Sequence, residues 1–198
     1  MILVIDTSAT MSAWAALVGD HSSAHLFTTS RNNRAITTHL ARMVKGKRLT
    51  AVAVATGPGS FTGLRVGVSF GLGLAMGLRI PIIPLPSLGL QAARTDVPAI
   101  AVMEAGRGRL YYQAPGGEPM LGDPADVPSS HPLVGNVGPK TEAALIAAGH
   151  RFIPAGELKD LSEAAKGMLE GAREVAYGSL KIEYMQSFSI PTKSEPSA

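Results

Sequence analysis

Two short stretches of this 198-residue chain carry residue types that can hold a phosphate group. The first is Asp6-Thr7-Ser8, which ends an apolar run and can turn hydroxyls, amides and a carboxylate toward a phosphate or its metal. An ordinary turn that closes a hairpin is the alternative. The second is GPGSFTGLRVG, residues 57–67, whose amides can bind an anion at the start of a helix. The predicted nucleotide-binding residues are Asp6, Thr7, Ser8, Gly57, Gly59 and Ser60.

The glycine-rich stretch lacks two familiar catalytic patterns. A nucleotide-binding P-loop requires a lysine directly after its last glycine, and Leu64 follows Gly63 here. A nucleophile elbow requires G-x-S-x-G, whereas Ser60 lies in G-S-F-T-G. Arg65 stands near the predicted helix start, where it can assist an anion.

Glycines continue beyond this loop into a helix predicted over residues 62–78. Each interior glycine costs about 1 kcal/mol relative to alanine, so this helix gives up roughly 4 kcal/mol of intrinsic stability. Gly63, Gly67 and Gly71 recur every four residues and form a smooth stripe that another backbone can approach closely. The approaching element can belong to a partner or to the chain itself, and both interpretations stay open.

The remaining composition excludes several classes of site. The chain has no cysteine, which excludes disulfides, thiolate zinc sites and cysteine nucleophiles. Its five histidines include no HExxH motif and have no carboxylate cluster beside them. We therefore predict no metal site and no catalytic residue.

Charge is distributed unevenly along the chain. Residues 1–95 hold nine Lys and Arg against Asp6 and Asp20, whereas residues 96–198 hold nine against thirteen Asp and Glu. A basic first half suits an anionic partner such as a nucleotide, tRNA or an acidic protein. A solvated basic surface is the alternative.

Hydrophobic patterning predicts a repeated order of elements. In the first half we expect strands at 2–6, 12–18 and 23–29, a helix at 35–45, a strand at 49–56, the helix at 62–78 and an edge strand at 80–86. Ser87 is expected to cap a further helix that runs through Gln91 to Arg94. In the second half we expect a hairpin of 99–104 with 109–113, a strand at 132–138, a helix at 139–149, a strand at 151–155 and a helix from Asp160 to Val175.

This order predicts an α/β, two-lobed, actin-like (ASKHA, ribonuclease-H-like) fold with a truncated second lobe. The expected divisions are a first lobe at 1–97, a smaller second lobe at 98–188 and a disordered tail at 189–198. The longest uncharged apolar run, Val66 to Leu78, is 13 residues and too short to span a bilayer. With no charged leader segment, we expect a cytoplasmic protein and no membrane partner.

Three segments resemble the TsaB (YeaZ) family of tRNA threonylcarbamoyladenosine biosynthesis proteins. They are MILVIDTS, AVAVATGPGSFTGLRVGVSFGLGLAMGL and PIIPLPSLGLQA, which lie within residues 1–95 and share a specific GPGSFTGLR core. AVMEAGRGRLYYQ is similar to a strand-turn-strand of the family, with Glu104 and Gly106 in place of the usual aspartate and arginine.

The resemblance implies a non-catalytic subunit. Family members pair with a paralogue, TsaD, that transfers threonylcarbamoyl to the adenosine beside the tRNA anticodon, and an ATPase, TsaE, joins the pair. Ser87 and Gln91 stand where TsaD has two metal-binding histidines, and a hydroxyl and an amide cannot replace two imidazoles. The resemblance thus argues against this chain being an enzyme.

The same resemblance places the partner surface on the helices at 35–45 and 62–78. Alone, family members pair with a second copy of themselves through this surface. No cofactor is expected to be bound tightly, whereas ATP or ADP is expected at a partner interface. The predicted interface residues are His39, Met43, Gly63, Leu64, Gly67, Val68, Gly71 and Leu74.

Two other functions remain open from the sequence. The predicted nucleotide-binding residues would suit an autonomous actin-like ATP-dependent phosphotransferase. The basic first lobe would suit direct RNA binding, although the strands show no aromatic stacking pair.

Overall fold

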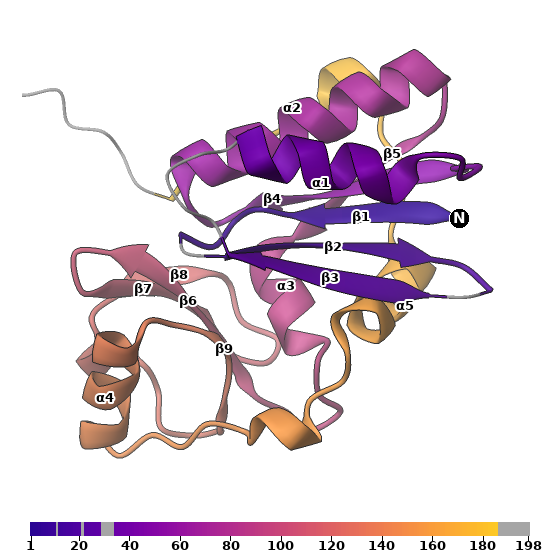
Figure 1. The fold of residues 1–198 in the computed structure, drawn as a ribbon. Coiled ribbons are helices and arrows are strands. Elements are labelled where there is room, and N and C mark those ends of the chain that lie inside the picture. The colour runs from indigo at the N-terminus through magenta and orange to yellow at the C-terminus, as the bar shows by residue number, and fades with distance from the viewer. Residues whose placement is uncertain (11, 21, 29–33, 186–198) are drawn as a thin grey trace, which may run out of the picture.

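The computed structural model describes residues 1–10, 12–20, 22–28 and 34–185, and it contains two β-sheets with helices around them (Figure 1). The first sheet has the strand order β3-β2-β1-β4-β5. Its strands are β1 (Ile2–Asp6), β2 (Ser12–Val18), β3 (Ser23–Thr28), β4 (Ala51–Gly57) and β5 (Ile82–Pro86). β1 is antiparallel to β2 and parallel to β4, so the predicted ribonuclease-H-like arrangement is confirmed.

Burial explains where each strand lies in this sheet. All seven residues of β4 are buried, because helices cover both of its faces and an uninterrupted apolar strand suits that position. β5 lies at the edge, as predicted from Pro84 and Pro86, which cannot donate to a neighbouring strand. Val175 N donates a hydrogen bond of 3.0 Å to Ile82 O and protects that edge.

Helices pack on both faces of the first sheet. α1 (Arg34–Val44) and α2 (Phe61–Leu78) cover one face, where their side chains join a core with β1, β2 and β4. α3 (Ser87–Ala92) and α5 (Leu161–Gly171) lie on the other face, with Trp14, Leu90 and Ala165 between them and the sheet.

The second sheet has the strand order β8-β7-β6-β9. It consists of β6 (Ile100–Gly106), β7 (Arg109–Gln113), β8 (Met120–Gly122) and β9 (Leu133–Asn136), with α4 (Pro139–Ala147) on its outer face. The inner face packs on Leu88 of α3. α3 therefore lies between the two sheets, and the two-lobed α/β fold is confirmed (Figure 1).

Several details differ from the sequence prediction. β8 was not predicted, and the expected strand at 151–155 is reduced to one bridge between Phe152 and Leu133. Ser87 does not cap α3: the residue before the helix is Pro86, and Ser87 Oγ accepts a hydrogen bond from Gly57 N at 3.1 Å. α5 begins after Asp160 as predicted but ends at Gly171, before Val175 turns to the sheet edge.

The chain returns to the first lobe after Leu161. α5 packs on the first sheet, and residues 175–182 then add apolar side chains to the core beneath α2. Tyr177 Oη donates to Ile80 O at 2.8 Å, just beyond the end of α2. Part of segment 98–188 is thus spatially joined to the first sheet, and the predicted tail at 189–198 lies outside the described residues.

Candidate functional site

The two predicted phosphate-binding stretches meet at the end of β1. Ser60 N donates a hydrogen bond of 2.7 Å to Ser8 O. Gly59 packs directly on Ser8, since an added Cβ would lie 2.6 Å from Ser8 Cβ. The sequence therefore identified a real spatial cluster.

The hydroxyls of that cluster point into the protein. Thr7 is buried, and its Oγ1 donates a hydrogen bond of 2.6 Å to Gly63 O. Ser8 has no exposed surface, and its Oγ has no hydrogen-bond partner among the described residues. The Thr7 hydroxyl joins the turn to the start of α2. Both hydroxyls are buried and closed off from a phosphate in solution.

Asp6 connects β1 to β2. Its Oδ1 accepts from Ser8 N at 2.8 Å, and its Oδ2 accepts from Trp14 Nε1 at 3.0 Å. Asp6 and Trp14 are paired residues of the first hairpin, so this bond follows from the strand register. Burial raises the pKa of Asp6, while the hydrogen bonds from Ser8 and Trp14 oppose that rise.

The backbone at Glu183, near the C-terminal end of the described chain, covers the start of the glycine loop. Gly57 has a φ of +124°, which favours glycine, and an added Cβ there would collide with the carbonyl oxygen of Glu183. Glu183 N also donates to Thr56 O at 2.8 Å. Of the predicted nucleotide-binding residues, Gly59 and Ser60 line a hollow of about 250 Å³.

The start of α2 carries an aromatic stack. Ser60 is the N-cap, and its Oγ accepts from Gly63 N at 3.3 Å. The Arg65 guanidinium lies 3.7 Å from the Phe61 ring centroid, and its Nε donates to Tyr184 Oη at 3.1 Å. Arg65 thus stacks on the Phe61 ring and is hydrogen-bonded to Tyr184, a role that the sequence did not predict.

The predicted glycine stripe faces the chain's own sheet. Added Cβ atoms at Gly63, Gly67 and Gly71 would collide with Thr7 O, Thr7 Oγ1 and Val54 Cγ1 respectively. Leu64 and Val68, also predicted as partner contacts, are buried on the same side. The intramolecular alternative therefore accounts for these five residues, and their assignment to a partner interface is corrected.

The opposite face of α2 is open. An added Cβ at Gly73 or Gly77 would have no neighbour within 4 Å, so internal packing does not explain either glycine. Met76 is 52% exposed and Leu78 is 50% exposed. Only five of the 18 residues of α2 are buried.

α2 is also the one described helix that is long and apolar enough to cross a membrane. The sequence prediction counted only the uncharged run after Arg65, whereas the helix begins at Phe61. The criterion concerns length and composition alone, and helices that pack on a protein core meet it as well. In this structure one face of α2 packs on β1 and β4.

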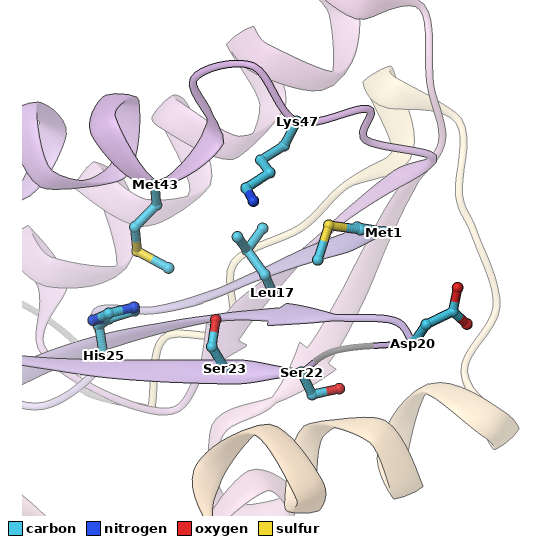
Figure 2. Close-up of a pocket in the computed structure, with 8 residues that line it drawn as sticks. All are labelled: Met1, Leu17, Asp20, Ser22, Ser23, His25, Met43 and Lys47. Atoms are coloured by element: carbon cyan, nitrogen blue, oxygen red, sulfur yellow. The ribbon is translucent and has the colours of Figure 1, made fainter.

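The other predicted interface residues flank this face. His39 is exposed on α1, while Met43 and Leu74 are half-buried at the edge of the core. Figure 2 shows a hollow of about 530 Å³ in which Met43 and Lys47 face Leu17 across the gap between α1 and the β2–β3 hairpin. Its polar groups lie on an exposed rim and do not converge on a common point.

Ser87 and Gln91 lie one turn apart on α3, and both are buried. The described residues contain no group of three or more His, Cys, Asp or Glu side chains that could hold a metal ion. Glu104 serves the fold: its Oε2 accepts from Gly138 N at 3.0 Å and its Oε1 from Thr141 Oγ1 at 2.9 Å. It thereby caps the start of α4.

Both the sequence and the fold are similar to those of known proteins. Residues 30–126 match the model of a family described as TsaD, tRNA N6-adenosine threonylcarbamoyltransferase. TsaB of Escherichia coli K12 is 33% identical over 69 residues, which are 32% of this chain and 30% of that protein. TsaB of Bacillus subtilis 168 is 41% identical over 66 residues, which are 32% of this chain and 29% of that protein.

The likeness to a solved structure extends over nearly the whole chain. YeaZ from Pseudomonas aeruginosa superimposes with a TM-score of 0.72 at 20% identity, covering 93% of this chain and 99% of that one. In sequence and in fold the chain is thus similar to TsaB (YeaZ) proteins. The structural likeness establishes a TsaB (YeaZ) fold, while the aligned sequence spans about 30% of these two curated relatives.

Proposed function

We propose that this chain is a non-catalytic scaffold subunit of tRNA threonylcarbamoyladenosine biosynthesis that pairs with TsaD through α1 and α2. The observation that carries the proposal is the open face of α2, which is apolar, long and without a partner among the described residues. The curated relatives are named as biosynthesis proteins of this modified nucleoside, which supports the pathway.

The outward face has the composition of a helix-packing surface. Val66, Ser69, Gly73, Met76 and Gly77 project away from the residues that α2 buries. Helical glycines cost about 1 kcal/mol each, and close packing of a second helix can recover that cost. We therefore assign the contact with TsaD to these outward residues of α2 in place of the glycine stripe that faces the sheet. His39, Met43 and Leu74 remain part of the proposed contact.

The non-catalytic part of the proposal rests on α3. Ser87 Oγ already accepts a hydrogen bond from Gly57, and Gln91 presents an amide, so neither supplies an imidazole for a metal. In the proposed complex TsaE joins the pair, tRNA is bound by the assembly, and ATP or ADP lies at a partner interface. We further propose a cytoplasmic location and self-pairing when TsaD is absent.

The two other functions receive less support. An autonomous ATP-dependent phosphotransferase would require accessible hydroxyls at Thr7 and Ser8, and both are buried. Direct RNA binding would need exposed stacking rings, and the aromatic stack at Phe61 is already occupied by Arg65.

Reconstitution tests the proposal directly. The purified chain should neither hydrolyse ATP nor modify tRNA by itself, and it should restore modification when TsaD, TsaE and threonylcarbamoyl-AMP are supplied. Robust ATP hydrolysis by the isolated chain would overturn the scaffold function.

A pair of matched variants tests the surface. Met76→Glu places a charge on the outer face of α2 and should abolish co-elution with TsaD and self-pairing on size exclusion. Ile146→Glu on α4 is the control, because Ile146 is 56% exposed and Met76 is 52% exposed. Equal pairing by both variants would show that TsaD does not dock on α2.

A further inference from the structure

A small crevice between the two sheets brings together polar groups that the proposed function does not use. It has a volume of about 110 Å³ and is lined from both lobes. Asn136 Nδ2 of β9 donates a hydrogen bond of 3.1 Å to Ser12 Oγ of β2 and bridges the lobes at this point. Asp6 also lines the crevice.

Two buried polar atoms of the crevice lack hydrogen-bond partners among the described residues. They are Gln91 Oε1, on a side chain that is 6% exposed, and Arg94 Nε. Asp160 lies near enough to Arg94 to raise its pKa, although burial has the larger effect and lowers it. Native proteins leave few buried polar atoms unpaired, so an unpaired acceptor and an unpaired donor in one crevice point to an occupant.

The dimensions limit that occupant. Nucleotide-sized ligands occupy pockets of about 300–1,000 Å³, which excludes a nucleotide. An apolar cavity of about 150 Å³ holds benzene, so this crevice has room for roughly four to six non-hydrogen atoms. Trp14, Leu26 and Met103 contribute apolar wall, which suits a short aliphatic group.

We propose that the crevice binds a small aliphatic α-amino acid of about the size of alanine. Its carboxylate accepts hydrogen bonds from the Arg94 guanidinium, and its ammonium group donates to Gln91 Oε1. A zwitterion satisfies the unpaired donor and the unpaired acceptor together, and its carboxylate is opposite in charge to the Arg94 guanidinium. The site is separate from the outer face of α2 and does not depend on pairing with TsaD.

The single tryptophan makes the test direct. Trp14 lines the crevice, and its indole N–H donates to Asp6, so its NMR resonance reports on the site. Titration of the full chain with L-alanine should shift that resonance saturably. Propionate lacks the amine, ethylamine lacks the carboxylate and L-leucine is too large, so each should produce a much smaller shift.

Variants separate the crevice from other binding sites. Arg94→Met and Gln91→Leu should each weaken L-alanine binding by about tenfold or more, because each removes one hydrogen bond to a charged ligand group. Arg173→Met is the control, since Arg173 is exposed outside the crevice and should leave binding unchanged. The unligated indole resonance reports whether each variant keeps the native fold.

Three results would overturn the proposal. One is an indole resonance that L-alanine leaves unmoved in the wild-type chain, which would indicate a crevice filled by water. Another is an equal response to propionate, which would indicate a site for carboxylates alone. The third is undiminished L-alanine binding by folded Arg94→Met and Gln91→Leu.

Discussion

Asp6 has a side chain that could take part in catalysis, but in this structure it stabilises the turn between β1 and β2. It is 3% exposed, and each of its oxygens accepts one hydrogen bond, from Ser8 N and from Trp14 Nε1. Those bonds hold the turn after β1 and tie it to β2. The neighbouring hydroxyls of Thr7 and Ser8 are also buried, so the turn is a structural joint that leads into α2.

The raised pKa of Asp6 predicts a pH dependence of stability. Its ordinary value is 3.8, and burial makes the folded state favour the protonated acid. The contribution of Asp6 is therefore fully present below pH 3.8 and is lost as the pH rises through its folded-state pKa. Asp6→Asn cannot ionise, so its stability relative to the wild type should increase over that pH range.

Urea denaturation of both proteins at several pH values would measure this difference. The difference between the two proteins isolates Asp6 from the other titrating groups. A constant difference across the range would contradict a raised pKa.

At the scale of elements, α2 has two glycine-bearing faces with different roles. Gly63, Gly67 and Gly71 let the helix lie directly on β1 and β4, where added Cβ atoms would collide with Thr7 and Val54. Gly73 and Gly77 face open space and contribute nothing to internal packing. The helix is therefore seated closely on its own sheet, and its outer face is smooth and open.

This asymmetry predicts opposite effects of the same substitution. Gly63→Ala should destabilise the isolated chain by about 1–3 kcal/mol, because the new methyl meets the Thr7 carbonyl oxygen. Gly73→Ala should stabilise it by about 1 kcal/mol, because the alanine gains helix propensity without a clash.

Chemical denaturation of the two variants provides the comparison. Similar effects at both positions would contradict the inner and outer assignment.

At the scale of the whole molecule, α3 couples the two lobes. Leu90 packs against the first sheet, and Leu88 packs against the second. The segment after Leu161 then returns to the first sheet and adds α5 to the same layer. Because both lobes share one central helix, we expect them to unfold together.

Leu88→Ala tests this coupling. Leu88 is fully buried, and the change should cost about 2–5 kcal/mol. Trp14 fluorescence reports on the first lobe, and hydrogen exchange of β6 and β7 reports on the second; both should shift to the same lower midpoint. Met120→Ala is the control, since Met120 is 51% exposed and should change stability by less than about 0.5 kcal/mol. Separate midpoints in Leu88→Ala would contradict a shared core.

The sequence by itself determined the elements whose signals are local. β1 and β2 have the predicted bounds, and the helix predicted at 62–78 begins one residue earlier, because apolar periodicity and turn residues act over a few neighbours. The resemblance to the TsaB (YeaZ) family was likewise readable from contiguous motifs. β8 escaped prediction because it has three residues, and the expected strand at 151–155 lacks a pairing partner beyond one bridge.

Only the tertiary structure decided which way those elements face. The spacing of Gly63, Gly67 and Gly71 predicted a close contact but not the element on the other side of it. Periodicity shows which residues share one face of a helix, whereas the element that packs on that face is set by the tertiary structure. The phosphate-binding potential of Asp6, Thr7 and Ser8 depended on exposure, which long-range packing sets. The crevice at Gln91 and Arg94 was invisible in the sequence, since its walls come from strands and helices of both lobes.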